Sequence, residues 1–278
     1  MRLGIFAKTF PGDTPGTVMA AARAAGYDSV QYNMACSGLP SMPPAIPDGV
    51  AEAVHVAALG QKLDVAAVSA TYNMIHPDPA QRWRGHDSLE IIAGAAHGMR
   101  TRLLTLCTGT RDPDDQWRGH PDNATPEAWR DLAASLETAL DIAERHDVDL
   151  GIEPELANVI DSAAKARAII DEMASPRLKI ILDPANLFEI ASLAEQQRLV
   201  SEAIDLLADR IVMAHAKDRD AVGGFTTAGK GVLDYDHYLA GLARIGFNGP
   251  LVTHGLAAGE AAEVAAFLGR KLAEVIAR

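Results

Sequence analysis

The chain has 278 residues, is 48% hydrophobic and 22% charged, and carries a formal net charge of −12, which is the composition of a globular protein with a large core. The negative charge argues against nucleic-acid binding, because lysine and arginine would have to neutralise the phosphates, although a local basic cluster could still bind a small anion. Two cysteines, Cys36 and Cys107, exclude a disulfide framework and predict a reduced, cytoplasmic setting.

The first half of the chain alternates short apolar runs with helix-like segments. The N-terminal run MRLGIFAKTF is too short for a signal sequence and predicts a strand over residues 3–10. A helix follows over residues 14–26, with Pro15 in its first turn and Gly26 past its end. Further strands are predicted over 29–34, 64–71 and 102–106, and further helices over 48–63 and 88–99.

Two loops stand out in this half. A proline-rich segment covers residues 40–47, and a polar segment covers residues 109–125. The second is longer than most loops in a compact domain, and loops of that length are usually functional or disordered. We expect both loops to shape a pocket.

The second half continues the same alternation. The helix over 126–146 has the clearest pattern, because Leu132, Leu136 and Ala139 recur at helical spacing after Pro126. The remaining strands are predicted over 149–152, 179–182, 210–214 and 249–253, and the remaining helices over 162–173, 194–207, 235–245 and 260–277. No apolar stretch approaches the roughly 20 residues of a membrane helix, so no membrane association is expected.

Eight strand–helix pairs predict the fold. Alternating strands and helices are typical of a parallel α/β sheet, and eight units in a chain of this length predict a closed (β/α)₈ TIM barrel. We expect one such domain over residues 1–278. An open, doubly wound sheet is the alternative, but the G-x-G-x-x-G motif that would favour it does not follow the first strand.

Potential metal ligands follow four consecutive strands. Glu153, Asp183, His215 and His254 are each about one strand–helix unit apart, so the barrel would carry all four around one rim. Two carboxylates and two imidazoles suit a divalent metal; we expect Mn²⁺ first, with Co²⁺, Zn²⁺, Fe²⁺ and Mg²⁺ as alternatives. A purely polar, hydrogen-bonded rim is the other interpretation, and Asp183 alone could simply cap a turn.

Several motifs resemble the xylose-isomerase-like TIM-barrel superfamily. They are GIEPE around Glu153, ILDPAN around Asp183, MAHAKD around His215 and GKGVLDY before the last strand. The segments TYNMIHPD and LCTGTRDPDDQW resemble its sugar phosphate isomerase/epimerase branch. The resemblance covers nearly the whole chain. It implies a barrel enzyme but does not choose among sugar isomerases, ketose 3-epimerases, inosose dehydratase, 3-dehydroshikimate dehydratase and endonuclease IV.

The resemblance also implies a metal site, from which this chain departs at one position. In the superfamily a Glu, an Asp, a His and a final Glu bind one divalent metal, and the first three match Glu153, Asp183 and His215. His254 stands where the final Glu is usual. It could bind metal through a neutral nitrogen, or act as an acid or base near its ordinary pKa of about 6.5. With two carboxylates, the occupied site would have a net charge near zero.

Two further candidates lie beyond the ligands on the same strands. Glu155 lies two residues past Glu153 and would share its face if the strand continues, which makes it a candidate substrate-binding group. Lys217 lies two residues past His215 and could stabilise a developing enolate or bind a substrate oxygen.

The remaining candidates are loop residues. Asn186 stands where some relatives have a substrate-binding His, as the resemblance implies, and His76 is expected to line the pocket. Trp117 could pack against the C–H face of a sugar, and Arg111 could bind a carboxylate or phosphate. For Trp117 and Arg111 a plain surface position is the alternative.

These observations favour a metal-dependent sugar isomerase or epimerase acting on a small polyhydroxy carbonyl compound through an enediolate. Glu153 or His254 would move the proton, with Lys217 stabilising charge. A metal-dependent lyase or dehydratase acting on a keto-sugar or cyclitol, and a non-catalytic sugar-binding barrel, are the alternatives. Endonuclease activity is disfavoured by the negative charge. We expect a sugar or polyol as the partner, and the resemblance implies that the chain could form a homo-oligomer.

Overall fold

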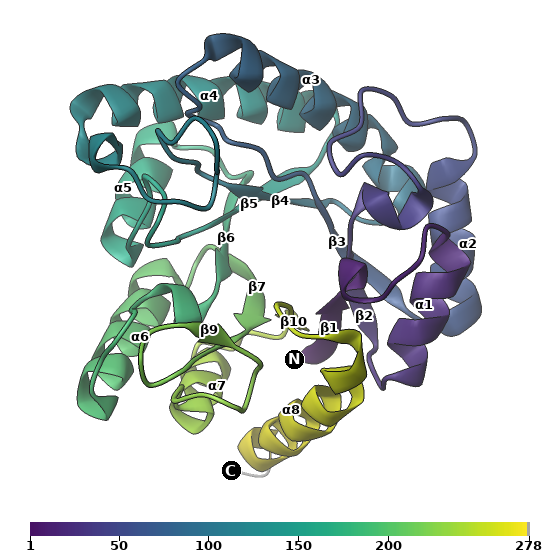
Figure 1. The fold of residues 1–278 in the computed structure, drawn as a ribbon, viewed down its shortest axis with the longest axis vertical. Helices are drawn as coiled ribbons and strands as arrows, with labels where there is room; N and C mark the ends of the chain where they lie inside the picture. The colour runs from purple at the N-terminus through teal and green to yellow at the C-terminus, as the bar shows by residue number, and fades with distance from the viewer. Residues whose placement is uncertain (277–278) are drawn as a thin grey trace.

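Eight short parallel strands close into a barrel in the computed structural model, which describes residues 1–276 (Figure 1). Around the barrel the order is β1-β10-β7-β6-β5-β4-β3-β2, so each strand lies beside its neighbours in sequence within the barrel set, and the pairing of β1 with β10 closes the barrel. The strands are β1 (Arg2–Phe6), β2 (Ser29–Tyr32), β3 (Asp64–Ser69), β4 (Leu103–Cys107), β5 (Asp149–Glu153), β6 (Leu178–Leu182), β7 (Ile211–Ala216) and β10 (Pro250–Thr253). The predicted (β/α)₈ barrel is confirmed.

Eight helices surround the strands and bury their apolar faces against them (Figure 1). They are α1 (Pro15–Ala24), α2 (Val50–Gln61), α3 (Pro79–Ala96), α4 (Pro126–Arg145), α5 (Ala163–Met173), α6 (Leu193–Leu207), α7 (Tyr235–Arg244) and α8 (Ala261–Ile276). In α1 and α3 to α7, a Ser, Thr or Asp before the helix accepts an N–H of the first turn, which explains where these helices begin. Among residues 1–276, none of the helices is both long enough and apolar enough to cross a membrane.

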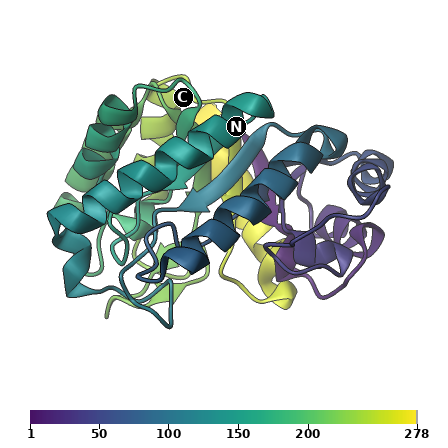
Figure 2. The ribbon, with the colours of Figure 1, turned by 90° about the horizontal axis from the view of Figure 1, so that it is seen from above.

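Short 3-10 helices connect several of these elements: η1 (Ala7–Thr9), η2 (Met34–Ser37), η3 (His97–Met99), η4 (Pro121–Ala124), η5 (Pro184–Asn186) and η6 (Ala258–Glu260). Three of them follow barrel strands with at most one residue between: η1 after β1, η2 after β2 and η5 after β6. Figure 2 shows that both chain ends lie at one end of the barrel, whereas the loops that follow the strands gather at the other.

The inside of the barrel is filled by a small apolar cluster. Ala67, Ile181, Met213 and Val252 come from β3, β6, β7 and β10 and form a cluster separate from the larger core between strands and helices. Because β3 and β7 lie on opposite sides of the barrel, these side chains meet through its interior. They close the barrel below the polar strand ends, so a ligand can enter only from the carboxyl face.

Two predicted boundaries are wrong. The first strand ends at Phe6 rather than residue 10, because the chain turns into η1. The predicted helix over 88–99 begins nine residues earlier, as α3, where Asp78 accepts the N–H of Ala80 and Pro79 occupies the first turn. The sequence PAQRWRGHD at the start of α3 is mostly polar and has no clear apolar period, so only the cap marked its beginning.

A small hairpin beside the barrel was not predicted. It pairs β8 (Asp218–Arg219) with β9 (Phe225–Thr226) in antiparallel fashion. The buried Asp218 carboxylate holds the following loop by accepting the N–H groups of Gly229 at 3.0 Å, Gly231 at 3.2 Å and Leu233 at 2.9 Å. Strands of two residues carry no alternating pattern, which is why periodicity did not indicate them.

Candidate metal centre

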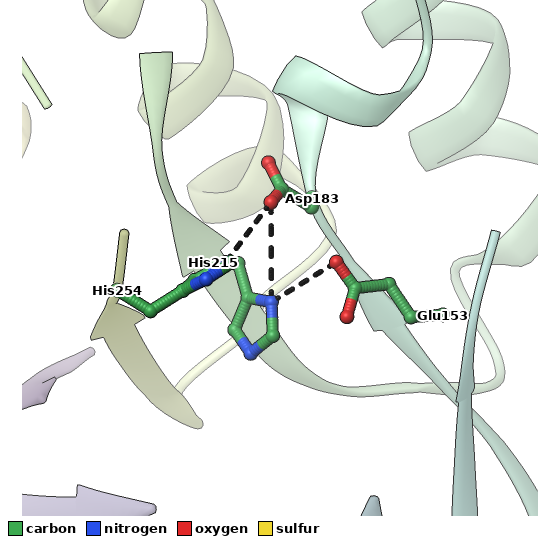
Figure 3. Close-up of side chains that lie close together, drawn as sticks. All are labelled: Glu153, Asp183, His215 and His254. Atoms are coloured by element: carbon green, nitrogen blue, oxygen red, sulfur yellow. Dashed lines mark hydrogen bonds and ion pairs between the residues drawn. The ribbon is translucent and has the colours of Figure 1, made fainter. Parts of the chain in front are cut away.

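Four side chains from neighbouring strands converge at the carboxyl end of the barrel (Figure 3). Glu153 ends β5, Asp183 follows β6, His215 lies within β7 and His254 follows β10. Each offers one ligand atom, and these atoms all lie within 4.8 Å of one another. The side chains of Asp183 and His215 are almost fully buried, whereas those of Glu153 and His254 are 18% and 22% exposed. The structure therefore brings together the four residues that the strand ends predicted.

Asp183 owes its position to the proline that follows it. Pro184 has no N–H, so the strand ladder ends there and the chain turns into η5. One carboxylate oxygen of Asp183 accepts the N–H of Ala185 at 2.9 Å. The other faces the cluster, 3.2 Å from Nε2 of His254 and 4.0 Å from Nδ1 of His215. Asp183 thus caps a turn with one oxygen and leaves the second free as a ligand.

A glutamine on β2 sets the tautomer of His215. Gln31 donates from its amide nitrogen to Oγ1 of Thr105 at 3.1 Å, so its amide oxygen is left to accept. That oxygen lies 3.1 Å from Nε2 of His215, which must therefore carry the proton. The lone pair is then on Nδ1, which points at Oε1 of Glu153 at 3.2 Å. Such a partner on the far nitrogen typically orients a metal-binding histidine.

The donor set fits a divalent cation. The unprotonated Nδ1 of His215 and Oε1 of Glu153 lie 3.2 Å apart and repel each other unless a proton or a cation lies between them. Burial lowers the pKa of His215, but the charges of Glu153 and Asp183 outweigh this and raise the pKa above its usual value. Burial also lowers the pKa of His254, and in this case burial outweighs the neighbouring carboxylates, so the pKa lies below its usual value. His254 therefore favours the neutral form, which can bind a metal. Two oxygens and two imidazole nitrogens match a first-row divalent metal.

A cavity of about 520 Å³, here the central cavity, opens above the cluster. Four other predicted side chains line it: Glu155, Asn186, Lys217 and Trp117. Asn186 donates from Nδ2 to Oε1 of Glu153 at 2.8 Å. Its Oδ1 is buried and has no hydrogen-bond partner among residues 1–276, so it remains available to a ligand hydroxyl.

Lys217 is held by an aromatic ring rather than by a carboxylate. Its Nζ lies 3.2 Å from the ring centroid of Phe225, and the guanidinium carbon of Arg219 lies 3.8 Å from the same centroid. Arg219 also donates to the carbonyls of Ala185 and Gly223, at 2.7 and 2.6 Å, and so fixes the hairpin. Within the described chain Lys217 forms no ion pair, which leaves its charge available to a substrate oxygen.

Glu155 adds a third carboxyl group to this cavity. Its backbone leaves the strand and donates to the carbonyl of Ile160 at 2.9 Å. Burial and the charge of Glu153 raise the pKa of Glu155 to about 7, while Lys217 acts in the opposite direction. The group can therefore donate or accept a hydrogen bond near neutral pH.

Two predicted residues do not reach the central cavity. The guanidinium of Arg111 pairs with Asp131 at 2.7 Å and donates to the carbonyl of Ile75 at 3.1 Å, so it faces α4. His76 lies 3.0 Å from the carbonyl oxygen of Pro113 and lines a neighbouring cavity instead. Both contacts involve the loop over 109–125: it contains Arg111, which pairs with α4, and Pro113, which holds His76 from the β3–α3 connection.

Sequence reasoning missed other residues of the central cavity. Gln31 carried a weak signal, because it is a polar residue between Val30 and Tyr32 in the strand predicted over 29–34. Lys8 lies just past β1, in a segment that was assigned to the first strand. Phe225 had no signal, since its position depends on the unpredicted hairpin.

Comparisons with known proteins agree with the fold. The family model described as "Xylose isomerase-like TIM barrel" matches residues 19–270. A solved 3-keto-D-glucoside 4-epimerase from E. coli superposes with a TM-score of 0.76 at 17% identity, covering 97% of this chain and 99% of that one. An L-ribulose 3-epimerase superposes with a TM-score of 0.77 at 18% identity, covering 99% of this chain and 95% of that one. A D-allulose 3-epimerase from Methylomonas sp. superposes with a TM-score of 0.75 at 17% identity, covering 98% of each chain. A search of curated protein sequences found no match.

Proposed function

The chain belongs to the xylose isomerase-like TIM-barrel family, and we propose that it is a divalent-metal-dependent isomerase or epimerase acting on a small polyhydroxy carbonyl compound. The observation that carries this proposal is the convergence of Glu153, Asp183, His215 and His254 at the floor of the central cavity. The names of the structural neighbours, which include a glucoside 4-epimerase and two ketose 3-epimerases, support a sugar as the substrate.

These four residues would hold the metal, with Mn²⁺ the first expectation and Co²⁺, Zn²⁺, Fe²⁺ or Mg²⁺ the alternatives. When bound, the ion supplies Lewis-acid polarisation of a carbonyl group and its neighbouring hydroxyl, which makes the adjacent C–H acidic. The backbone N–H of Ala185, the amide of Gln31 and the amide of Asn186 hold three of the ligands in place. The protein therefore fixes the ligands before the ion arrives.

Proton transfer falls to Glu153 and His254. Oε1 of Glu153 accepts the amide N–H of Asn186 and faces Nδ1 of His215, whereas Oε2 makes no hydrogen bond to the rest of the described chain and can take the proton from carbon. An epimerase must also return a proton to the other face of the same carbon. His254 lies across the cluster, three strands along the barrel from Glu153. It is our candidate for this step in the alternative arrangement in which Glu153, Asp183 and His215 alone bind the metal, because a nitrogen that ligates the ion has no proton to return.

Four other groups would bind the substrate and its developing charge. Lys217 can move from the Phe225 ring to an oxygen that becomes negative as the proton leaves. The unpaired Oδ1 of Asn186 can accept a sugar hydroxyl, and Glu155 can bind a second one. The exposed ring of Trp117 offers a flat surface to the C–H face of the sugar.

Metal content tests the first half of the proposal. We expect about one divalent ion per chain by elemental mass spectrometry, and loss of that ion in Asp183→Ala, because Asp183 provides a buried ligand oxygen. A wild-type protein without metal, even after incubation with Mn²⁺, Co²⁺ and Zn²⁺, would contradict it and favour a non-catalytic sugar-binding barrel.

Solvent exchange tests the second half. Metal-loaded protein is incubated with a panel of ketoses and aldoses in D₂O, and proton NMR follows the C–H next to the carbonyl. An isomerase or epimerase gives deuterium incorporation and an isomeric product, whereas a lyase gives an unsaturated product with new absorbance. If Glu153→Gln retains the metal and full turnover, Glu153 is not the base.

A further inference from the structure

A second and larger cavity, here the outer cavity, lies beside the central one. Its volume is about 900 Å³, within the range of small-molecule sites, and its walls include Tyr72, His76, Gln81, Arg84, Asp87 and Trp117. Gln116 and Trp117 line both cavities. The same two segments contribute to the walls of both cavities: in the loop over 40–47 and in the β3–α3 connection, some residues line the central cavity and their neighbours line the outer one. The proposed reaction uses only the central cavity.

The wall between the cavities is a well-ordered loop. The buried carboxylate of Asp112 accepts the N–H groups of Asp114 and Asp115 at 2.9 Å and the guanidinium of Arg118 at 2.7 Å. Asp115 in turn accepts the N–H of Trp117 at 2.9 Å. This network holds the backbone of Trp117, whose side chain is 52% exposed. An exposed tryptophan that lines two cavities indicates a binding surface rather than a core position.

The polar groups of the outer cavity identify the class of its ligand. Arg84 forms no ion pair within residues 1–276, and Gln81 adds an amide that can donate and accept. Four aspartates, Asp87, Asp112, Asp114 and Asp115, line the cavity together with this one arginine. The excess of negative charge disfavours a phosphate or carboxylate ligand. An uncharged sugar ring matches this cavity. Its hydroxyl groups can hydrogen-bond to the amide, guanidinium and carboxylate groups, and its apolar C–H face can pack against the indole.

We infer that the substrate has two sugar units, and this inference rests on the proposed function. The reacting unit, which carries the carbonyl group, occupies the central cavity, and an uncharged glycosyl unit occupies the outer cavity. Trp117 packs between them, and Arg84 and Gln81 bind hydroxyls of the second unit. Binding energy from this remote unit then contributes to the rate at the reacting carbon.

The test compares D-fructose with two of its disaccharides, isomaltulose and lactulose, which carry a sugar on O6 and O4 of fructose. Metal-loaded protein is assayed for deuterium exchange in D₂O, and kcat/KM is measured for each compound. We expect at least one disaccharide to exceed D-fructose about tenfold. Arg84→Ala should reduce that ratio at least about fivefold, because one charged contact to the second unit is lost. Arg130→Ala, which removes an exposed arginine of α4 outside both cavities, should leave the ratio unchanged.

The inference is overturned if neither disaccharide exceeds D-fructose, or if Arg84→Ala lowers kcat/KM equally for all three. If no sugar exchanges deuterium, the proposed function fails, and calorimetric titration with the same three sugars still decides the inference. A disaccharide that binds about tenfold more tightly than D-fructose, with the difference lost in Arg84→Ala, supports a two-unit site. Equal binding, or no binding, of all three sugars overturns it.

Discussion

Replacing Gln31 by methionine should weaken metal binding without removing a ligand. Methionine has nearly the length of glutamine but offers no comparable acceptor to Nε2 of His215. In the metal-free variant the imidazole proton moves to Nδ1, where Oε1 of Glu153 accepts it. Metal binding must then return the proton to Nε2 of His215. In the variant this buried N–H has no hydrogen-bond acceptor. A buried donor without an acceptor costs about 1–3 kcal/mol, which corresponds to a loss of roughly 5- to 150-fold in affinity.

The assay is calorimetric titration of Mn²⁺ into chelator-treated protein, with the wild type, Gln31→Met and Gln31→Glu side by side. Gln31→Glu retains an acceptor for Nε2 and should bind Mn²⁺ at least as tightly as the wild type. Thermal unfolding by circular dichroism checks that all three proteins fold. If folded Gln31→Met binds Mn²⁺ within twofold of the wild type, His215 does not ligate through Nδ1 in the tautomer argued above.

Three further substitutions test the ligand set, a titrating core residue and the packing of α3. His254→Glu should raise the ratio of Mn²⁺ to Zn²⁺ affinity at least about tenfold in the same titration, because a carboxylate suits the harder ion; an unchanged ratio means that residue 254 is not a ligand. Burial lowers the pKa of His86 below its unfolded value of about 6.5, so its contribution to stability is complete above pH 6.5 and is lost as the pH falls through the folded pKa. Urea unfolding should therefore show a smaller loss of stability between pH 7.5 and pH 5 in His86→Gln than in the wild type; equal losses refute this assignment. Gly85→Ala would place a Cβ 2.0 Å from the Tyr72 ring and should cost about 1–3 kcal/mol in unfolding free energy, whereas Gly60→Ala on α2, with open space at its Cβ, should be neutral or stabilising.

The barrel and the cluster could be predicted because both depend on local signals that repeat. Each strand is a short apolar run, and each ligand follows such a run, so the parallel arrangement alone places Glu153, Asp183, His215 and His254 at one rim. Registers between strands were not needed for this step. The prediction rests on the closure of the barrel, which the number of strand–helix units determines.

The groups around the ligands could be predicted only in part, because the positions of several depend on loops: Glu155, Asn186, Lys217 and Trp117 line the central cavity as expected, but others do not. His76 and Arg111 were expected in one pocket, but Pro113 and Asp131 hold them outside the central cavity. Phe225 reaches that cavity only because a two-residue hairpin turns back over β7. Loop conformation is set by hydrogen bonds between residues far apart in sequence, and a single sequence gives no periodic signal for such contacts.

The departure at His254 is compatible with this architecture because the supports of the other candidate ligands do not involve His254. Asp183 is held by the N–H of Ala185, His215 by Gln31 on β2, and Glu153 by the amide of Asn186. Exchanging the group at the end of β10 therefore changes the charge of the proposed centre without dismantling the rest. With a neutral imidazole in that place, two carboxylates would balance a divalent ion, and the occupied centre would carry no net charge. Such a centre would repel a negative charge developing on the substrate less than a centre with a third carboxylate, and Lys217 can add a positive charge beside it.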